Sequence, residues 1–280
     1  MLDRSIVWRR FTRNRLASAG AIGVFVLVAL ATLAPWVAPR DPLYIDMAHK
    51  FARPGEAGFV LGADELGRDL LSRLLHAGRV SLAVGLITAL IAVCVGSILG
   101  AVAGFYGGAV DSAIMRVVDV LLSIPTIFLL LALAAFLKPT MLTITLIIGL
   151  NSWMSVARMV RGQVLSLKEQ EFVLAARAAG AGAGRLIVRQ LLPNAVAPVL
   201  VAATLTVATA ILLESSLSYL GYGIQPPTAS WGNMLNNAQS YVLYAPWVAV
   251  YPGAMISLTV LSFNFAGDGL RDALDPRLGP

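Results

Sequence analysis

The sequence predicts an all-α integral membrane protein with six transmembrane helices. Of its 280 residues, 58% are hydrophobic and only 13% are charged, about half the roughly 25% typical of a soluble globular protein. The hydrophobic residues lie in long uncharged runs, whereas a membrane β-barrel would show short alternating segments. Lipid offers backbone amides no partner, so such runs must form helices. The composition excludes an ordinary soluble enzyme, a disordered protein and a coiled coil.

Six segments are long enough to cross a bilayer, which takes about 20 apolar residues. They are residues 17–38, 80–106, 112–137, 139–157, 194–220 and 244–266. The first is longer than the apolar core of a signal peptide, so we expect it to remain as an anchor rather than to be cleaved. An even number of spans places both termini on one side of the membrane.

The distribution of arginine and lysine predicts which side that is. Five arginines lie in the N-terminal arm, residues 1–16, and six basic residues face only two acidic ones in the connection 158–193. Residues 215–267 contain no charged side chain. The positive-inside rule therefore places both termini and the 158–193 connection in the cytoplasm. The segment 39–79 has balanced charge, and we expect it to be extracytoplasmic.

Residues 64–79 of this outer segment have the pattern of an interfacial helix. Five leucines share one face, Asp64 is a candidate N-cap, and Asp69 and Arg73 have the spacing of an ion pair. Such a helix could lie flat on the membrane, contact an external partner, or do both. The remaining residues, 80–280, are expected to form a five-helix core.

Four features inside the predicted spans bear on helix packing or transport. Gly96, Gly100 and Gly104 form a small-residue stripe, whose default role is close helix packing. Asp119 is costly in a membrane and is a functional candidate, although a structural pair with Arg116 is an alternative. Pro125 should kink its helix. Glu214 lies near the outer end of the fifth span, where it could line a cavity mouth or cap a neighbouring helix. Asp119, Pro125 and Glu214 are thus our candidates for a pathway or gate.

The cytoplasmic connection 158–193 is expected to form a hairpin of two short helices. The first should run from 168 to 179 and end at Gly180, a favourable residue for a helix C-terminus. Phe172, Ala175, Ala176 and Ala179 would form a small apolar ridge on it. Such a ridge suits insertion into a groove of another protein, while packing back onto the membrane domain is the alternative.

At this hairpin the sequence resembles a known family. The run FVLAARAAG at 172–180, followed by Leu192-Pro193-Asn194, resembles the "EAA" signature of ABC importer permeases. Leu174 stands where that signature usually has Glu, and Gln190 where Ile or His is common. Four further runs resemble the dipeptide/oligopeptide/nickel permease group, and most closely its C-type subunit. They are LGADELGRDLLSR at 61–73, AGFYGGAVDSAIMRVVD at 103–119, LESSLSYLGYGIQPPTASWGNML at 213–235 and GDGLRDALDPRL at 267–278.

The resemblance implies a type I importer half-pore with the MetI-like permease fold in a bacterial inner membrane. It implies four kinds of partner besides lipid: a homologous B-type permease, two cytoplasmic ATPase subunits, an extracytoplasmic binding protein and a peptide substrate. A nickel complex or another small solute is the alternative cargo. By the same resemblance the hairpin is the coupling helix that docks on an ATPase subunit. Its contact residues would be Phe172, Ala175, Ala176, Arg177 and Gly180.

The sequence itself indicates that the energy for transport is supplied by another subunit. A P-loop needs a Gly-Lys-Ser/Thr triplet, and no lysine of the chain follows a glycine. We therefore expect no cofactor or metal in this chain, ATP and Mg²⁺ on partner subunits, no enzymatic activity and no nucleic-acid binding. An ion-coupled secondary transporter would need midplane ionisable residues and usually a repeat. An intramembrane hydrolase would need a recognisable catalytic motif, such as H-E-x-x-H, which is absent from the sequence.

Overall fold

The computed structural model of the protein describes residues 4–274, and helices are its main elements. Within that range, one isolated bridge between Ala63 and Asp69 is the only β-type pairing. The helices are α1 (Arg4–Arg13), α2 (Arg15–Thr32), α3 (Ala34–Val37), η1 (Met47–His49), η2 (Glu56–Gly58), α4 (Leu70–Tyr106), α5 (Gly108–Leu122), α6 (Thr126–Phe136), α7 (Met141–Leu167), α8 (Glu171–Ala178), α9 (Ala183–Leu186), η3 (Ile187–Leu191), α10 (Leu192–Asn194), α11 (Val196–Tyr219), α12 (Trp231–Ala238) and α13 (Trp247–Leu274).

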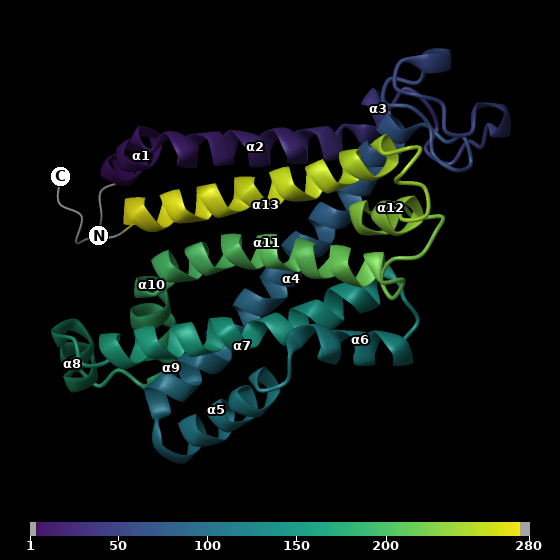
Figure 1. Ribbon diagram of the computed structural model, residues 1–280. Coiled ribbons are helices and arrows are strands. Elements are labelled where there is room, and N and C mark those ends of the chain that lie inside the picture. The colour runs from purple at the N-terminus through teal and green to yellow at the C-terminus, as the bar shows by residue number, and fades with distance from the viewer. Residues whose placement is uncertain (1–3, 275–280) are drawn as a thin grey trace.

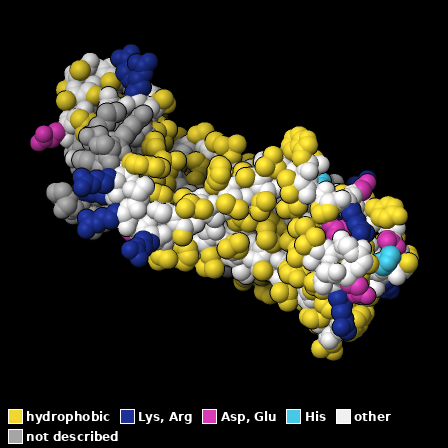
Figure 2. All heavy atoms as spheres, turned by 90° about the horizontal axis from the view of Figure 1, so that it is seen from above, with side chains coloured by type: hydrophobic (Ala, Val, Ile, Leu, Met, Phe, Trp, Pro, Cys, Tyr) yellow, Lys and Arg dark blue, Asp and Glu magenta, His cyan; other side chains and the backbone are white. Residues whose placement is uncertain are grey.

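Five helices are long and apolar enough to cross a membrane, namely α2, α4, α7, α11 and α13. The pair α5 and α6 makes a sixth span if it counts as one, but it is bent by 86°. The long helices lie in a bundle, with α1 and α8 at one end and residues 39–69 with α12 at the other (Figure 1). Charged side chains gather at the two ends, with an apolar surface between them (Figure 2). The all-helical membrane fold predicted from the sequence is confirmed.

The outer segment differs from its prediction. Residues 70–79 do not form a separate helix; they are the beginning of α4, a single helix of 37 residues in total. The N-cap is Asp69, which accepts a hydrogen bond from the Ser72 amide at 2.8 Å, and not Asp64. Asp64 instead pairs with Arg68 (2.7 Å) and Arg73 (3.3 Å), so the expected Asp69–Arg73 pair is also wrong. This buried network explains why the run at 61–73 carries so many charges.

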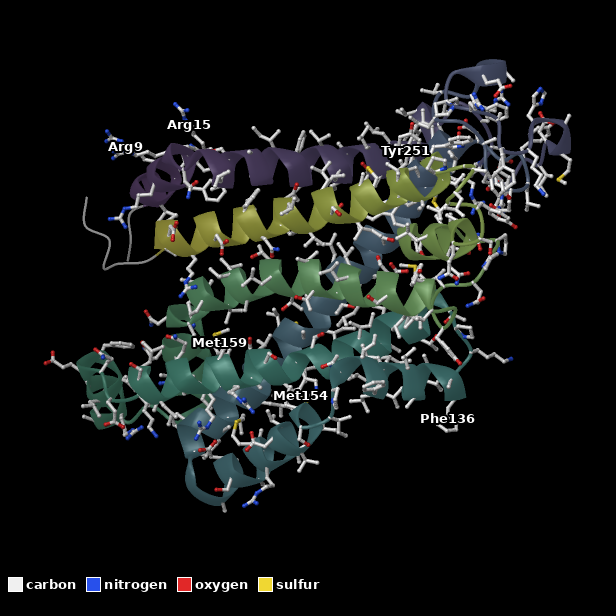
Figure 3. The ribbon with its side chains drawn as sticks, viewed as in Figure 1. Arg9, Arg15, Phe136, Met154, Met159 and Tyr251 are labelled. Carbon is white, nitrogen blue, oxygen red and sulfur yellow. The ribbon has the colours of Figure 1, made fainter. Side chains whose placement is uncertain are left out.

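The third span contains the kink that Pro125 predicts, in a stronger form. The helix ends at Leu122 and restarts at Thr126, with Pro125 as the N-cap of α6. Proline lacks a backbone N–H and disfavours the helical conformation for the residue before it, so the chain breaks here instead of bending. Phe136, at the end of α6, points away from the bundle, while Arg9 and Arg15 lie at the opposite end of the molecule (Figure 3).

The glycine stripe packs α4 against α7, as predicted. A Cβ on Gly96 would lie 2.7 Å from the carbonyl oxygen of Trp153, and one on Gly104 would lie 2.9 Å from that of Arg161. A Cβ on Gly100 would collide with the carbonyl of Ala157. The two backbones can approach this closely because glycine has no side chain. The result is a rigid α4–α7 pair at the centre of the molecule.

Candidate functional site

The short helix α8 projects from the end of the molecule where α7 leaves the bundle (Figure 1). It is shorter than the 168–179 predicted, because α7 itself extends to Leu167, ten residues beyond the predicted end of its span. Gly180 ends α8 in a left-handed conformation (φ 81°). The Gly180 amide donates to Arg177 O and the Ala181 amide to Ala176 O, both at 3.0 Å. These two bonds form a Schellman motif, which turns the chain sharply towards α9.

The exposed face of α8 carries small and apolar side chains. Phe172, Ala175, Arg177 and Gly180 are exposed, as a contact surface requires, whereas Ala176 is partly buried and packs inward. The residue that anchors the helix is Val173, which is fully buried among Val160, Val164 and Leu186. Sequence reasoning missed Val173, although its i, i+3 spacing with Ala176 marks an inward face.

The base of this hairpin is held to α4 and α5 by charged groups. The Lys168 ammonium donates to the carbonyl of Gly104 near the end of α4 (3.3 Å). The Arg161 guanidinium on α7 forms a two-pronged bond with Asp111 on α5, the second contact at 2.6 Å. Paired contacts of this geometry fix orientation as well as distance. These contacts hold the end of α7, which leads into α8, against α4 and α5.

A groove of about 320 Å³ lies between the α5–α6 break, α7 and α11. Its polar lining is made only of neutral hydroxyl and amide side chains, without a charged group. These residues are Thr126, Asn151, Ser152, Ser155, Thr206 and Thr209. Such a wall can hydrogen-bond a polar solute inside the membrane without the cost of a buried charge. Sequence reasoning missed the groove because its members come from three separate helices.

Two of the predicted pathway residues lie beside this groove. Pro125 precedes Thr126, which lines it. Asp119 lies one helical turn from Leu122, another lining residue, and its carboxylate accepts a hydrogen bond from Arg158 of α7 at 2.7 Å. The expected pairing of Asp119 with Arg116 is therefore replaced by a contact between two helices. The ion pair joins α5 to α7 on the α8 side of the groove, without lining it.

The third predicted pathway residue, Glu214, is not at a cavity mouth. Its side chain is completely buried, and its carboxylate accepts hydrogen bonds from Ser218 (2.7 Å) and Ser81 of α4 (3.2 Å). The Ser81 hydroxyl in turn accepts the amide of Trp231, the first residue of α12 (3.2 Å). Glu214 thus joins α4 and α11 to the start of α12 through Ser81, whereas the side chain that caps α12 is that of Ser230.

Comparison with known families gives two matches. Residues 96–280 match the family described as "Binding-protein-dependent transport system inner membrane component". Residues 4–54 match the "N-terminal TM domain of oligopeptide transport permease C". The second match covers α1, α2 and the beginning of the outer segment, and the first covers the hairpin and the groove.

Individual relatives cover almost the whole chain. The chain is 42% identical to the "Di/tripeptide transport system permease protein DppC" of Pseudomonas aeruginosa (strain UCBPP-PA14), over 97% of this chain and 91% of the relative. It is 42% identical to the "Dipeptide transport system permease protein DppC" of Bacillus subtilis (strain 168), over 97% and 85%. The "Glutathione transport system permease protein GsiD" of Escherichia coli O157:H7 is also 42% identical, over 97% and 89%.

A solved structure shares the fold. A chain from the inward-facing MetNI methionine ABC transporter superposes with a TM-score of 0.57 at 22% identity, over 72% of this chain and 96% of that one. This likeness confirms the MetI-like fold, and the family matches confirm the resemblance. The chain therefore belongs to the inner-membrane permease subunits of binding-protein-dependent ABC importers, in the group that contains the dipeptide and oligopeptide C-type permeases.

Proposed function

We propose that this permease subunit forms half of a translocation pore for di- and oligopeptides and is driven by cytoplasmic ATPase subunits through α8. The observation that carries the proposal is the exposed, small-residue surface of α8 on a base fixed to α4 and α5. A short rigid helix with a shallow apolar surface suits a groove on another protein. Movement of α8 would reach the neutral groove through α7, because α7 leads into α8 and also lines the groove.

The neutral groove supports a peptide as the cargo. Peptides present amide N–H and C=O groups of constant spacing and side chains of variable charge. Hydroxyl and amide side chains such as Asn151 and Thr209 can exchange hydrogen bonds with the constant part. A wall without charged groups does not select among peptides by the charge of their side chains. Relatives named for dipeptides, di/tripeptides and glutathione, itself a tripeptide, agree with this cargo.

The proposed assembly contains a homologous B-type permease, two ATPase subunits that bind ATP and Mg²⁺, and an extracytoplasmic binding protein. It places α8 and both termini in the cytoplasm and residues 39–69 outside. The positive-inside distribution supports this orientation. The C-terminal residues 275–280 lie outside the described part of the chain, so only the end of α13 bears on that terminus.

Cysteine labelling tests the orientation, with Cys94 replaced by alanine. Ser166, on the extension of α7, and Thr228, in the loop before α12, are both exposed. A membrane-impermeant maleimide added to intact cells should label Ser166→Cys only after permeabilisation and Thr228→Cys before it. Labelling of both positions from the same side would contradict the proposed topology.

Uptake in an assembled importer tests the cargo. The chain would be expressed with its neighbouring permease, ATPase and binding-protein genes, reconstituted into liposomes, and supplied with ATP and a labelled dipeptide. We expect ATP-dependent uptake that unlabelled peptides compete out and that nickel salts do not. Uptake of a nickel complex without peptide competition would replace the peptide assignment.

A further inference from the structure

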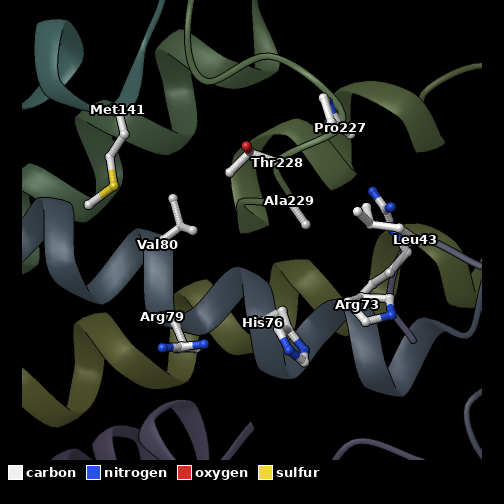
Figure 4. Close-up of a pocket in the computed structure, with 10 residues that line it drawn as sticks. Leu43, Arg73, His76, Arg79, Val80, Met141, Pro227, Thr228 and Ala229 are labelled. Carbon is white, nitrogen blue, oxygen red and sulfur yellow. The ribbon is translucent and has the colours of Figure 1, made fainter. Parts of the chain in front are cut away.

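The structure assigns a binding site for an anionic phospholipid along α4, at the end of this helix that follows the outer segment. Two hollows meet there and share Arg79. One is a pocket of about 460 Å³ that contains Arg73, His76 and Arg79 (Figure 4). The other is a groove of about 310 Å³ that runs between α2 and α4. The site depends only on the membrane location of the chain and not on its cargo.

The larger pocket has the chemistry of an anion site. Arg79 is exposed, and its guanidinium pairs with no carboxylate within residues 4–274. Arg73 is 2% exposed; its Nε lies 3.3 Å from Asp64 Oδ2, and its Nη1 has no hydrogen-bond partner within the same residues. His76 Nδ1 donates to the carbonyl of Ser72 at 2.9 Å, so Nε2 of the neutral ring is an acceptor and does not serve an anion. The guanidinium of Arg79 and Nη1 of Arg73 are thus the donors of a pocket that no acidic side chain lines.

The smaller groove has the chemistry of an acyl-chain site. Apart from Thr32 and Arg79, it is lined by aliphatic side chains, namely Val28, Ala31, Leu82, Ala83 and Leu86. From Arg79 to Leu86 α4 rises about 10 Å, so the groove runs from the cationic pocket along the helix into the membrane. The Thr32 hydroxyl bonds to its own helix, so the wall itself offers no free polar group at this level.

Together the two hollows match a lipid with a charged head and an apolar tail. Arg79 lies where α2 reaches its last turn, the level of the membrane interface. A guanidinium can donate paired hydrogen bonds to a lipid phosphate, and loss of one net hydrogen bond lowers affinity about fivefold. The phosphate and the tail would be held by different walls of one continuous site, which a free anion or a neutral lipid would use only in part.

Native mass spectrometry of the purified full-length chain tests this assignment. The chain would be titrated with phosphatidylglycerol, phosphatidylcholine or glycerol phosphate. We expect phosphatidylglycerol to bind several-fold more tightly than either of the others. Arg79→Gln should weaken phosphatidylglycerol binding about fivefold, while Arg53→Gln, at an exposed arginine that lines neither hollow, should leave it unchanged. Equal binding of the two lipids, or an Arg79→Gln variant that binds like wild type, would overturn the proposal.

Two further variants separate a lipid from other occupants. Ala83→Leu narrows the groove without changing charge, and it should weaken phosphatidylglycerol binding while the binding of glycerol phosphate stays as weak as in wild type. Unchanged phosphatidylglycerol binding in Ala83→Leu would show that the tail lies elsewhere and would overturn the site. Leu86→Cys, in the assembled importer lacking Cys94, should not cross-link to the second permease. A cross-link there would assign the groove to a partner helix instead.

Discussion

The carboxylate of Asp119 on α5 and the guanidinium of Arg158 on α7 meet at 2.7 Å, one helical turn from the neutral groove. Both side chains are more than half exposed in the isolated chain. They join two walls of the groove at the end that faces α8. The pair thus links α5 and α7 across 39 residues of sequence.

Loss of this pair should affect transport more than stability. An exposed ion pair contributes about 0–1 kcal/mol, so Asp119→Asn should leave the melting temperature nearly unchanged and reduce peptide uptake by up to about fivefold. The double variant Asp119→Arg with Arg158→Asp should recover part of the uptake. Arg116→Gln is the matched control. Equal loss in that control would point to surface charge in general and not to the pair.

Glu214 should be required for folding and not for the pathway. Glu214→Ala removes the acceptor of the Ser81 and Ser218 hydroxyls and leaves a cavity, at a cost of about 3 kcal/mol. Glu214→Gln keeps the shape of the side chain and an acceptor oxygen, so this variant should lose less stability than Glu214→Ala. Thermal unfolding in detergent measures both, with the exposed Ser216→Ala as control. A Glu214→Ala variant of normal stability that fails to transport would instead make this residue part of the pathway.

The α4–α7 contact should tolerate no side chain at Gly100. Gly100→Ala places a methyl group against the Ala157 carbonyl and should destabilise the protein by about 1–3 kcal/mol. Gly162→Ala, on α7 with nothing within 4 Å of the added Cβ, should be neutral or gain up to about 1 kcal/mol. Thermal unfolding of both variants compares them directly. Similar melting temperatures for the two would contradict the close packing of the helices.

Asn151 should contribute to peptide passage. Asn151→Leu removes an amide from the wall of the groove and should lower uptake by about fivefold, the effect of one net hydrogen bond of about 1 kcal/mol. Assembly and basal ATP hydrolysis should remain, because Asn151 lies away from α8. Leu150→Ala, at an exposed neighbouring position, is the control. Full uptake in Asn151→Leu would place the pathway outside this groove.

The sequence predicted those structural features that depend on residues close to one another along the chain. Hydrophobic runs located the spans, the spacing of Gly96, Gly100 and Gly104 predicted a close helix contact, and Pro125 predicted the interruption of the third span. Each of these effects depends on residues within a few turns of one another. The end of α8 at Gly180 followed in the same way, since only a residue tolerant of positive φ fits there easily.

What the sequence left open depends on contacts between helices. Asp119 has Arg116 one turn away in sequence, yet it pairs with Arg158, 39 residues distant. Asp64 likewise is the partner of Arg73 rather than a helix cap. The groove joins side chains of three helices, and no periodicity within one helix reveals it. The continuity of α4 through residues 70–79 was missed because the leucine face there suggested a separate interfacial helix, whereas the fold buries Leu70, Leu74 and Leu75 against other parts of the chain.

The central claim is that α8 is the contact through which ATP hydrolysis moves this permease, and a cross-link tests it most directly. A single cysteine at Ala175, introduced after Cys94→Ala, would be treated with a short bifunctional maleimide in the assembled, transporting importer. The same cysteine at Phe136, which is 89% exposed at the opposite end of the bundle, is the control. We predict a cross-link from position 175 to an ATPase subunit and none from position 136. An active complex with no cross-link at 175 would contradict the account.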